Sequence, residues 1–139
     1  MRILTSNDPP WLTLDAYCDL LDAIVDLDLV DHVAPIQLAI RLLIPRGSKL
    51  LELDEVRRLA GPFDPATLTY RWAHGDVRVD RLQEHVSALV GVKLTRSRRE
   101  VFDEVRALAH DAAGLPTVSR PRPARDRATV PYLNEPWYC

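Results

Sequence analysis

Residues 33–44 read Val33-Ala34-Pro35-Ile36-Gln37-Leu38-Ala39-Ile40-Arg41-Leu42-Leu43-Ile44, a nearly continuous apolar run that ends at Pro45. A run of this kind is typical of a strand that is buried on both faces of a parallel sheet. Because side chains alternate along a strand, one face would be wholly aliphatic and the other would carry Gln37 and Arg41. In a barrel, this second face would point into the lumen.

Arg41 is the most informative residue of the run, because a buried guanidinium requires an anionic partner. One interpretation is a carboxylate or phosphate clamp beside a substrate pocket. The alternatives are an internal salt bridge, or a strand end from which the side chain reaches water. Gln37, on the same face, is a second candidate for substrate binding.

Helices are predicted on both sides of this run. The first spans about residues 14–29 and is capped by Thr13. A short one ends at Leu59, and two longer ones span about 77–90 and 98–112 and should pack antiparallel. The last begins with a capping box of Ser97 and Glu100 and ends at Gly114. The apolar stripes at helical spacing are Leu14, Tyr17, Leu21 and Ile24; Val79, Leu82, Val86 and Leu89; and Val101, Val105, Leu108 and Ala112.

Two patterns between the short and the longer helices are less regular. Asp64-Pro65-Ala66 predicts a helix start, with proline at the first helical position. Tyr70-Arg71-Trp72 is either a platform for stacking or, as we favour, a packed and partly exposed surface.

Composition restricts the class of protein. The length of 139 residues fits one modest domain, and the net charge of −2 gives no general attraction to nucleic acid or to an anionic membrane. No apolar run reaches the roughly 18 residues of a membrane span, and the five glycines form no nucleotide-binding motif. Cys18 and Cys139 make neither a disulfide framework nor a metal knuckle, which favours a reducing, cytoplasmic compartment. No metal site is predicted.

The C-terminal part, residues 115–139, differs from the rest. Arginines and prolines alternate after residue 115 and predict an extended linker rather than an arm for nucleic acid, because Asp126 interrupts the positive charge. The linker leads to Val130-Pro131-Tyr132-Leu133-Asn134-Glu135-Pro136-Trp137-Tyr138-Cys139. Aromatic side chains of this kind should find somewhere to bury, so we expect this tail to dock into a groove.

Three stretches together resemble the C-terminal portion of radical SAM proteins with a CUAEP or CCAEP tail. They are residues 30–48 with the segment Ile40-Arg41-Leu42-Leu43-Ile44-Pro45, residues 61–65 with 70–72, and residues 132–139. The resemblance runs from about Trp11 to Cys139, and the tail is its most specific part. In that family the tail reads Cys-Sec-Ala-Glu-Pro or Cys-Cys-Ala-Glu-Pro, which suggests that the reading frame stops at a selenocysteine codon after Cys139. A shortened tail or a fragmented gene are the alternatives.

The resemblance implies an α/β fold in three parts. Residues 1–48 would supply a late strand and helix of a radical SAM (β/α) barrel. Residues 49–114 would form a mainly α-helical C-terminal extension. Residues 115–139 would be the Pro/Arg-rich linker and the apolar tail that ends in cysteine.

The resemblance also implies a chemistry for the full-length protein. A [4Fe–4S] cluster held by CxxxCxxC would cleave S-adenosylmethionine. That motif is absent from these 139 residues, so the chain alone would bind no cofactor, be inactive and need the N-terminal half of the barrel as its partner. Cys139 would be the catalytic residue, as half of a redox-active pair, while Gln37 and Arg41 would line the lumen.

Two further expectations remain. The isolated chain should self-associate, because the strand at 36–44 would expose an unpaired edge. The alternative function is that of a free-standing, small helical interaction protein whose aromatic tail docks on a partner.

Overall fold

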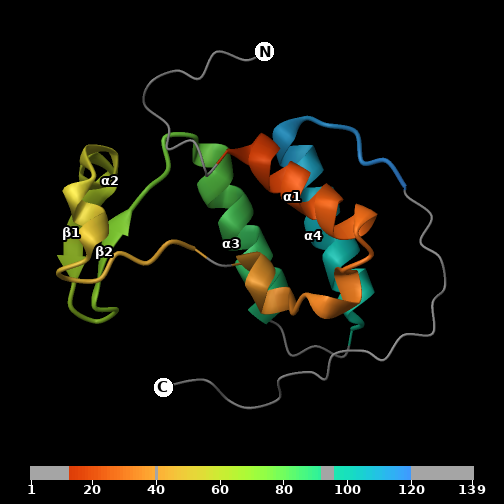
Figure 1. The fold of residues 1–139 in the computed structure, drawn as a ribbon, viewed down its shortest axis with the longest axis horizontal. Helices are drawn as coiled ribbons and strands as arrows, with labels where there is room; N and C mark the ends of the chain where they lie inside the picture. The colour runs from red at the N-terminus through yellow and green to blue at the C-terminus, as the bar shows by residue number, and fades with distance from the viewer. Residues whose placement is uncertain (1–12, 40, 92–95, 120–139) are drawn as a thin grey trace.

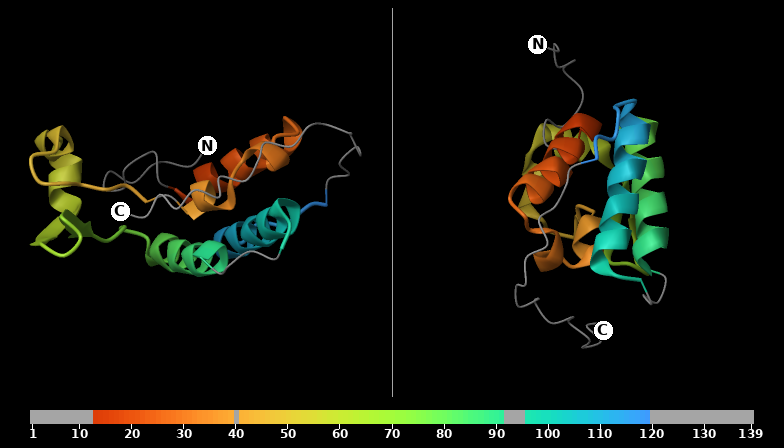
Figure 2. Two further views of the ribbon diagram at one scale, coloured as in Figure 1. Left: turned by 90° about the horizontal axis from the view of Figure 1, so that it is seen from below. Right: turned by 90° about the vertical axis from the view of Figure 1, so that its right-hand side faces the viewer.

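The structure, a computed structural model, describes residues 13–39, 41–91 and 96–119. Three long helices make up its larger part: α1 (Leu14–Asp26), α3 (Val77–Gly91) and α4 (Arg98–Ala113). Figure 2 shows α1 in one layer and α3 with α4 in a second layer beneath it. A smaller part, set apart from the helices in Figure 1, holds α2 (Asp54–Leu59) and the strands β1 (Ala60–Asp64) and β2 (Thr69–Trp72). Three 3₁₀ helices, η1 (Val30–His32), η2 (Pro35–Ala39) and η3 (Lys49–Glu52), lie in the connections.

The first helix confirms its predicted start and its apolar stripe. The Thr13 hydroxyl accepts a hydrogen bond from the Ala16 N–H at 3.1 Å and so satisfies one of the free donors of the first turn. Leu14, Leu21 and Ile24 are buried, and Tyr17 packs against the core as a partly buried side chain. The helix ends three residues earlier than predicted, at Asp26.

The antiparallel pair α3 and α4 is also confirmed. Ser97 and Glu100 form the predicted capping box, in which each side chain bonds to the backbone N–H of the other residue. Gly114 ends α4 in the left-handed conformation, with φ of 69°, and its N–H bonds to the Asp111 carbonyl at 3.0 Å. A β-carbon at that φ would be strained, which explains a glycine there.

One hydrophobic core joins the three long helices, η1 and η2. Its buried members are Leu14, Cys18, Leu21, Ile24, Val25, Val30, Leu38, Leu82, Val86, Val90, Val101, Phe102, Val105 and Ala109. The core therefore draws on residues from both sides of position 48, where the sequence predicted a boundary between two parts.

Charged side chains of α4 form ion pairs with α1 and η1. Arg106 is almost fully buried, and its Nε donates to Oδ1 of Asp22 on α1 at 2.7 Å. His110 lies one turn further on, with Nε2 at 3.5 Å from Oδ2 of Asp22. At the other end of α4, the Arg99 guanidinium pairs with the Asp31 carboxylate of η1.

The strand predicted for residues 33–44 is wrong over its first half. Pro35–Ala39 forms η2, which begins at the proline and is closed by a bond from the Gln37 N–H to the Ala34 carbonyl at 2.9 Å. The predicted aliphatic face is divided, because Leu38 is buried whereas Ile36 is 64% exposed. A central strand needs partners for its backbone on both sides, and the described residues provide none there, so this segment satisfies its backbone locally.

Residues 41–45, at the end of the same run, lie beside β2 and belong to no helix. The Ile44 carbonyl accepts from the Tyr70 N–H at 2.8 Å, and Pro45 forms a single antiparallel bridge with Thr69. In the part of the chain that the structure describes, the sheet consists of β1 and β2, paired antiparallel. A barrel that included residues 1–48 would require strands from another segment, so this assignment stays a prediction.

The helix start predicted at Asp64-Pro65-Ala66 is wrong, because these residues turn β1 into β2. The Asp64 carboxylate accepts from the Ala66 N–H at 2.9 Å and from the Arg71 guanidinium at 2.7 Å. The same side chain that can cap a helix here stabilises a hairpin turn. Phe63 and Tyr70 face each other across the strands with their ring centroids 5.3 Å apart.

Candidate functional site

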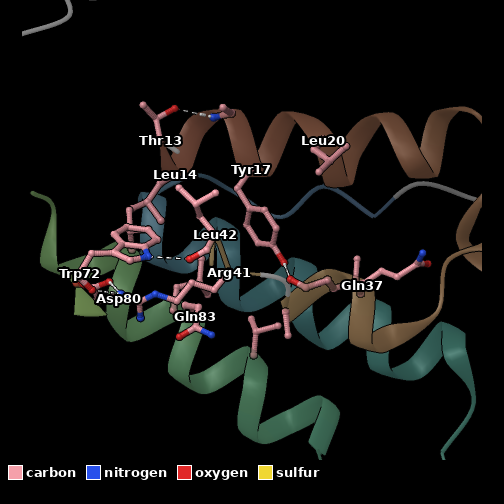
Figure 3. A pocket seen from close by; sticks show the side chains of 16 residues that line it. Thr13, Leu14, Tyr17, Leu20, Gln37, Arg41, Leu42, Trp72, Asp80 and Gln83 are labelled. Atoms are coloured by element: carbon pink, nitrogen blue, oxygen red, sulfur yellow. Dashed lines mark hydrogen bonds and ion pairs between the residues drawn. The ribbon is translucent and has the colours of Figure 1, made fainter. Parts of the chain in front are cut away.

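A cavity of about 330 Å³ lies between α1, η2 and α3, with Trp72 of β2 at one end (Figure 3). Its size falls at the lower end of the range for small-ligand pockets, roughly 300–1,000 Å³. The wall is predominantly apolar, with Leu14, Leu20, Leu38, Leu42, Leu82 and Val86 among the lining residues. The feature is a candidate binding site because it is concave, apolar and bordered by a few polar groups.

Arg41 stands at the Trp72 end of this cavity and has the anionic partner that the sequence required. Its Nη2 lies 3.3 Å from Oδ1 of Asp80 on α3, and it also donates to the Trp72 carbonyl. The guanidinium carbon lies 4.4 Å from the centre of the Trp72 ring, which is a cation–π distance. This geometry is that of an internal salt bridge, and binding of substrate by Arg41 stays a prediction.

Asp80 organises this end of the cavity from the first turn of α3. While Oδ1 faces Arg41, Oδ2 accepts from the backbone N–H of His74 at 2.9 Å. The Trp72 indole N–H in turn donates to the Leu42 carbonyl at 2.8 Å. One carboxylate and one indole therefore join the segment at 41–42, the end of β2 and the start of α3.

Tyr17 lines the cavity from α1. Its hydroxyl donates to the Leu38 carbonyl at 2.8 Å and links α1 to η2 (Figure 3). Burial, and to a smaller degree the neighbouring Cys18, raises the pKa of Tyr17 to about 12. The phenol therefore keeps its proton and acts as a hydrogen-bond donor to the backbone at neutral pH.

Gln37 lines the same cavity as Arg41, but the two side chains do not act together. The Gln37 Oε1 accepts from the Ala34 N–H at 2.9 Å, a bond that supports the start of η2. Figure 3 shows the Gln37 amide directed away from Arg41. The 3₁₀ helix explains this divergence, because positions that share a face in a strand point in different directions in a helix.

The polar groups that border the cavity already bond to the protein itself. Thr13 caps α1, Gln83 donates to the Ser87 hydroxyl at 2.8 Å, and Arg41 is paired with Asp80. The largest unused surface of the cavity is consequently its aliphatic and aromatic wall. Such a site suits an apolar or aromatic group, whereas an additional anion would have to compete with Asp80 for Arg41.

The sequence missed three residues of this site: Tyr17, Trp72 and Asp80. Tyr17 was assigned to the core stripe and Trp72 to a packed surface, and neither pattern indicates that the two border one cavity. Asp80 looks like an ordinary acidic residue of a first helical turn. Of the predicted site residues Arg41, Gln37 and Cys139, Cys139 lies outside the described residues.

Ligands for a metal centre are not brought together in the described part of the chain. Over residues 13–39, 41–91 and 96–119, no three His, Cys, Asp or Glu side chains are placed to hold a metal ion. Cys18 is 2% exposed, and burial, with Asp22 as the next cause, raises the pKa of its thiol. A thiol of this kind is a poor iron ligand and a poor nucleophile.

A scan against protein-family models and searches of curated proteins and of solved structures found no match to this chain. Among the described helices, none combines the length and the apolar character that crossing a membrane requires.

Proposed function

We propose that this chain is the C-terminal portion of a radical SAM enzyme of the CUAEP/CCAEP-tail family. The observation that carries the proposal is a contact between two of the stretches on which the resemblance rests. Residues 41–45 lie against residues 69–72: Ile44 bonds to Tyr70, Leu42 bonds to the Trp72 indole, and Arg41 stacks on Trp72. Two of the segments on which the resemblance rests thus lie in contact, and this contact supports a joint role for them.

In this proposal the chain positions groups and does not supply the cofactor chemistry. The described residues do not fit an iron–sulfur cluster, since Cys18 is buried and has no neighbouring ligands in a suitable arrangement. The cluster and S-adenosylmethionine would be held by the N-terminal barrel half, the partner of this chain. The helices α1, α3 and α4 would carry the linker and the tail, and Cys139 would be the redox-active end, in a cytoplasmic protein.

The nucleotide sequence on both sides of the reading frame tests this proposal. We expect an in-frame CxxxCxxC upstream, and a TGA codon after the Cys139 codon that is followed by codons for Ala-Glu-Pro. Ordinary intergenic sequence on both flanks would contradict the proposal. A biochemical test uses the full-length product, which should take up iron and sulfide and cleave S-adenosylmethionine, whereas the 139-residue chain should do neither.

A second candidate is a small helical interaction protein, and the cavity is the observation that favours it. Its apolar wall is bordered by polar groups that are already paired, which is the composition of a docking site for an apolar segment rather than of a catalytic centre. This candidate predicts a monomer that unfolds cooperatively and takes up no iron. Light scattering, thermal denaturation and iron analysis of the purified chain measure these properties.

A further inference from the structure

We infer that the cavity between α1, η2 and α3 is a docking site for the chain's own C-terminal tail, with Trp137 as the anchoring side chain. The inference goes beyond the proposed function and does not depend on it, because it concerns only residues of this chain. It rests on the chemistry of the cavity, the place at which the described chain ends, and the charge of the segment between the two.

The cavity and the tail match in chemistry. Tyr132, Trp137 and Tyr138 give the tail an aromatic character, and an aromatic side chain of this size buries roughly 150–250 Å². The cavity offers an aliphatic wall, and Leu20 at its margin is 54% exposed on α1. Because Arg41 is already paired with Asp80, the vacant surface favours an apolar occupant over a carboxylate or phosphate.

The described chain ends beside the helix that forms the cavity. The Arg106 Nε donates to Asp22 of α1, and Nη1 of the same guanidinium donates to the Val118 carbonyl at 3.0 Å. Val118 is therefore held next to the second half of α1. Tyr17, which lines the cavity, lies five residues before Asp22, or about 8 Å along the helix axis.

The remaining chain is long enough to reach the cavity. Residues 120–136 can extend to about 50 Å at the rise of a polyproline-type backbone. The whole of α1, with 13 residues, is about 20 Å long. The tail can thus pass across α1 and enter the cavity past Leu20 without stretching.

Charge complementarity supports this path. The segment between Ser119 and the aromatic tail contains Arg120, Arg122, Arg125 and Arg127, with Asp126 among them. Between Asp22 and the start of α1, the solvent-facing side that the linker would cross carries the exposed residues Asp15 and Asp19. Opposite charges along the path favour the linker on this helix and raise the local concentration of the tail near the cavity.

The experiment attaches a nitroxide to Cys139 of the full chain and records the amide signals by NMR. Cys18 is 2% exposed and stays unlabelled in the folded protein. We expect the signals of Leu20, Gln37 and Gln83, which line the cavity, to lose intensity. The signals of α2 should keep it, because α2 lies apart from α1 and α3 in Figure 1. Trp137→Ala should restore the cavity signals without any change in helix content by circular dichroism.

Two matched variants, one on α1 and one at its C-cap, test the cavity itself. Leu20→Glu places a charge at its margin and should also restore the signals. Leu27→Glu, at the C-cap of α1, changes a side chain that is 66% exposed and outside the cavity, and it should leave the intensity loss in place. Unchanged cavity signals in the labelled wild-type chain would overturn the inference.

A mixed sample distinguishes docking within one molecule from docking between two. In it, one chain carries the NMR isotopes but no nitroxide, and the other carries the nitroxide but no NMR isotopes. Intensity loss in this mixture would overturn the inference in favour of a second copy as the occupant. We expect no intensity loss in the mixture and full intensity loss when the same chain carries both the isotopes and the nitroxide. Neither readout involves the cluster or the flanking codons, so a failure here is distinguishable from a failure of the proposed function.

Discussion

Cys18 illustrates how burial controls the chemistry of a single side chain. It is 2% exposed on the core side of α1, and burial is the main cause that raises its thiol pKa. We expect Cys18 to resist alkylation by iodoacetamide near neutral pH in the folded chain and to react after denaturation, because the thiolate is the reactive form. Peptide mapping by mass spectrometry identifies the modified cysteine. Modification of Cys18 in the native protein would contradict the structure.

The pair of Asp22 and Arg106 is a second feature at the residue scale. The Arg106 side chain is 6% exposed, so removal of the Asp22 carboxylate would leave the buried guanidinium without this ion-pair partner. We expect Asp22→Ala to lower the free energy of unfolding by about 3 kcal/mol. The matched control is Asp19→Ala on the exposed side of the same helix, which should change it by about 0.5 kcal/mol or less. Urea denaturation measures both, and equal effects would contradict this role of Arg106.

The interaction of a single residue could be predicted where its side chain requires a partner of one kind. The need of Arg41 for an anion follows from its apolar surroundings in the sequence, and the structure supplies one. That the anion is Asp80, 39 positions away, depends on how β2 and α3 are placed. Sequence spacing carries no information about such a distant partner.

The capping box of α4 is a feature at the scale of the element. Ser97 accepts from the Glu100 N–H, and removal of this bond by Ser97→Ala should lower the free energy of unfolding by about 1 kcal/mol. Thermal denaturation at neutral pH measures this loss. An unchanged midpoint would show that the cap does not stabilise the helix.

The same cap predicts a pH dependence. Hydrogen bonds from Ser97, first from its backbone and then from its side chain, hold the pKa of Glu100 below its ordinary value in the folded chain. Stability from a carboxyl with a lowered pKa is fully present above the unfolded pKa, about 4.3, and is lost as the pH falls through the folded pKa. The difference in stability between wild type and Glu100→Gln should therefore shrink as the pH falls below about 4. Denaturation curves of both proteins across that range measure the difference, and a constant difference would contradict it.

Helices and strands differed in how well they could be predicted. Caps and apolar stripes lie within a few residues of one another, so α1, α3 and α4 were evident from local sequence. The strand prediction for residues 33–44 was wrong in its first half, because a strand is stable only when neighbouring strands complete its hydrogen bonds. At the end of the run, Ile44 and Pro45 pair with β2.

At the scale of the whole molecule, Arg41 joins the small part with β1 and β2 to the helices. We expect Arg41→Ala to lower the free energy of unfolding by about 2 kcal/mol, because it removes hydrogen bonds from a charged group. Amide exchange at Tyr70 should rise more than exchange within α4. Arg96→Ala removes an exposed ion pair with Glu104 and should change stability by about 0.5 kcal/mol or less. Uniform acceleration of exchange would show that Arg41 does not connect the two parts.

Self-association of the isolated chain stays a prediction, but its reason has changed. Over residues 36–39 the predicted strand edge is replaced by η2, and Ile44 and Pro45 pair with β2. The remaining cause is exposed apolar surface such as Ile36 at 64% and Leu43 at 68%. We expect the average mass from light scattering to rise with protein concentration. A constant monomer mass would contradict the prediction.

The sequence by itself determined the three long helices, their caps and the faces that they bury, since these depend on contacts between residues close in the chain. It also determined that Arg41 needs an anion. Only the tertiary structure decided the path of residues 33–44, the hairpin at Asp64 and the cavity of Tyr17, Trp72 and Asp80. These features arise where segments distant in sequence meet, and their backbone and side-chain groups are satisfied only by neighbours that the fold brings to them.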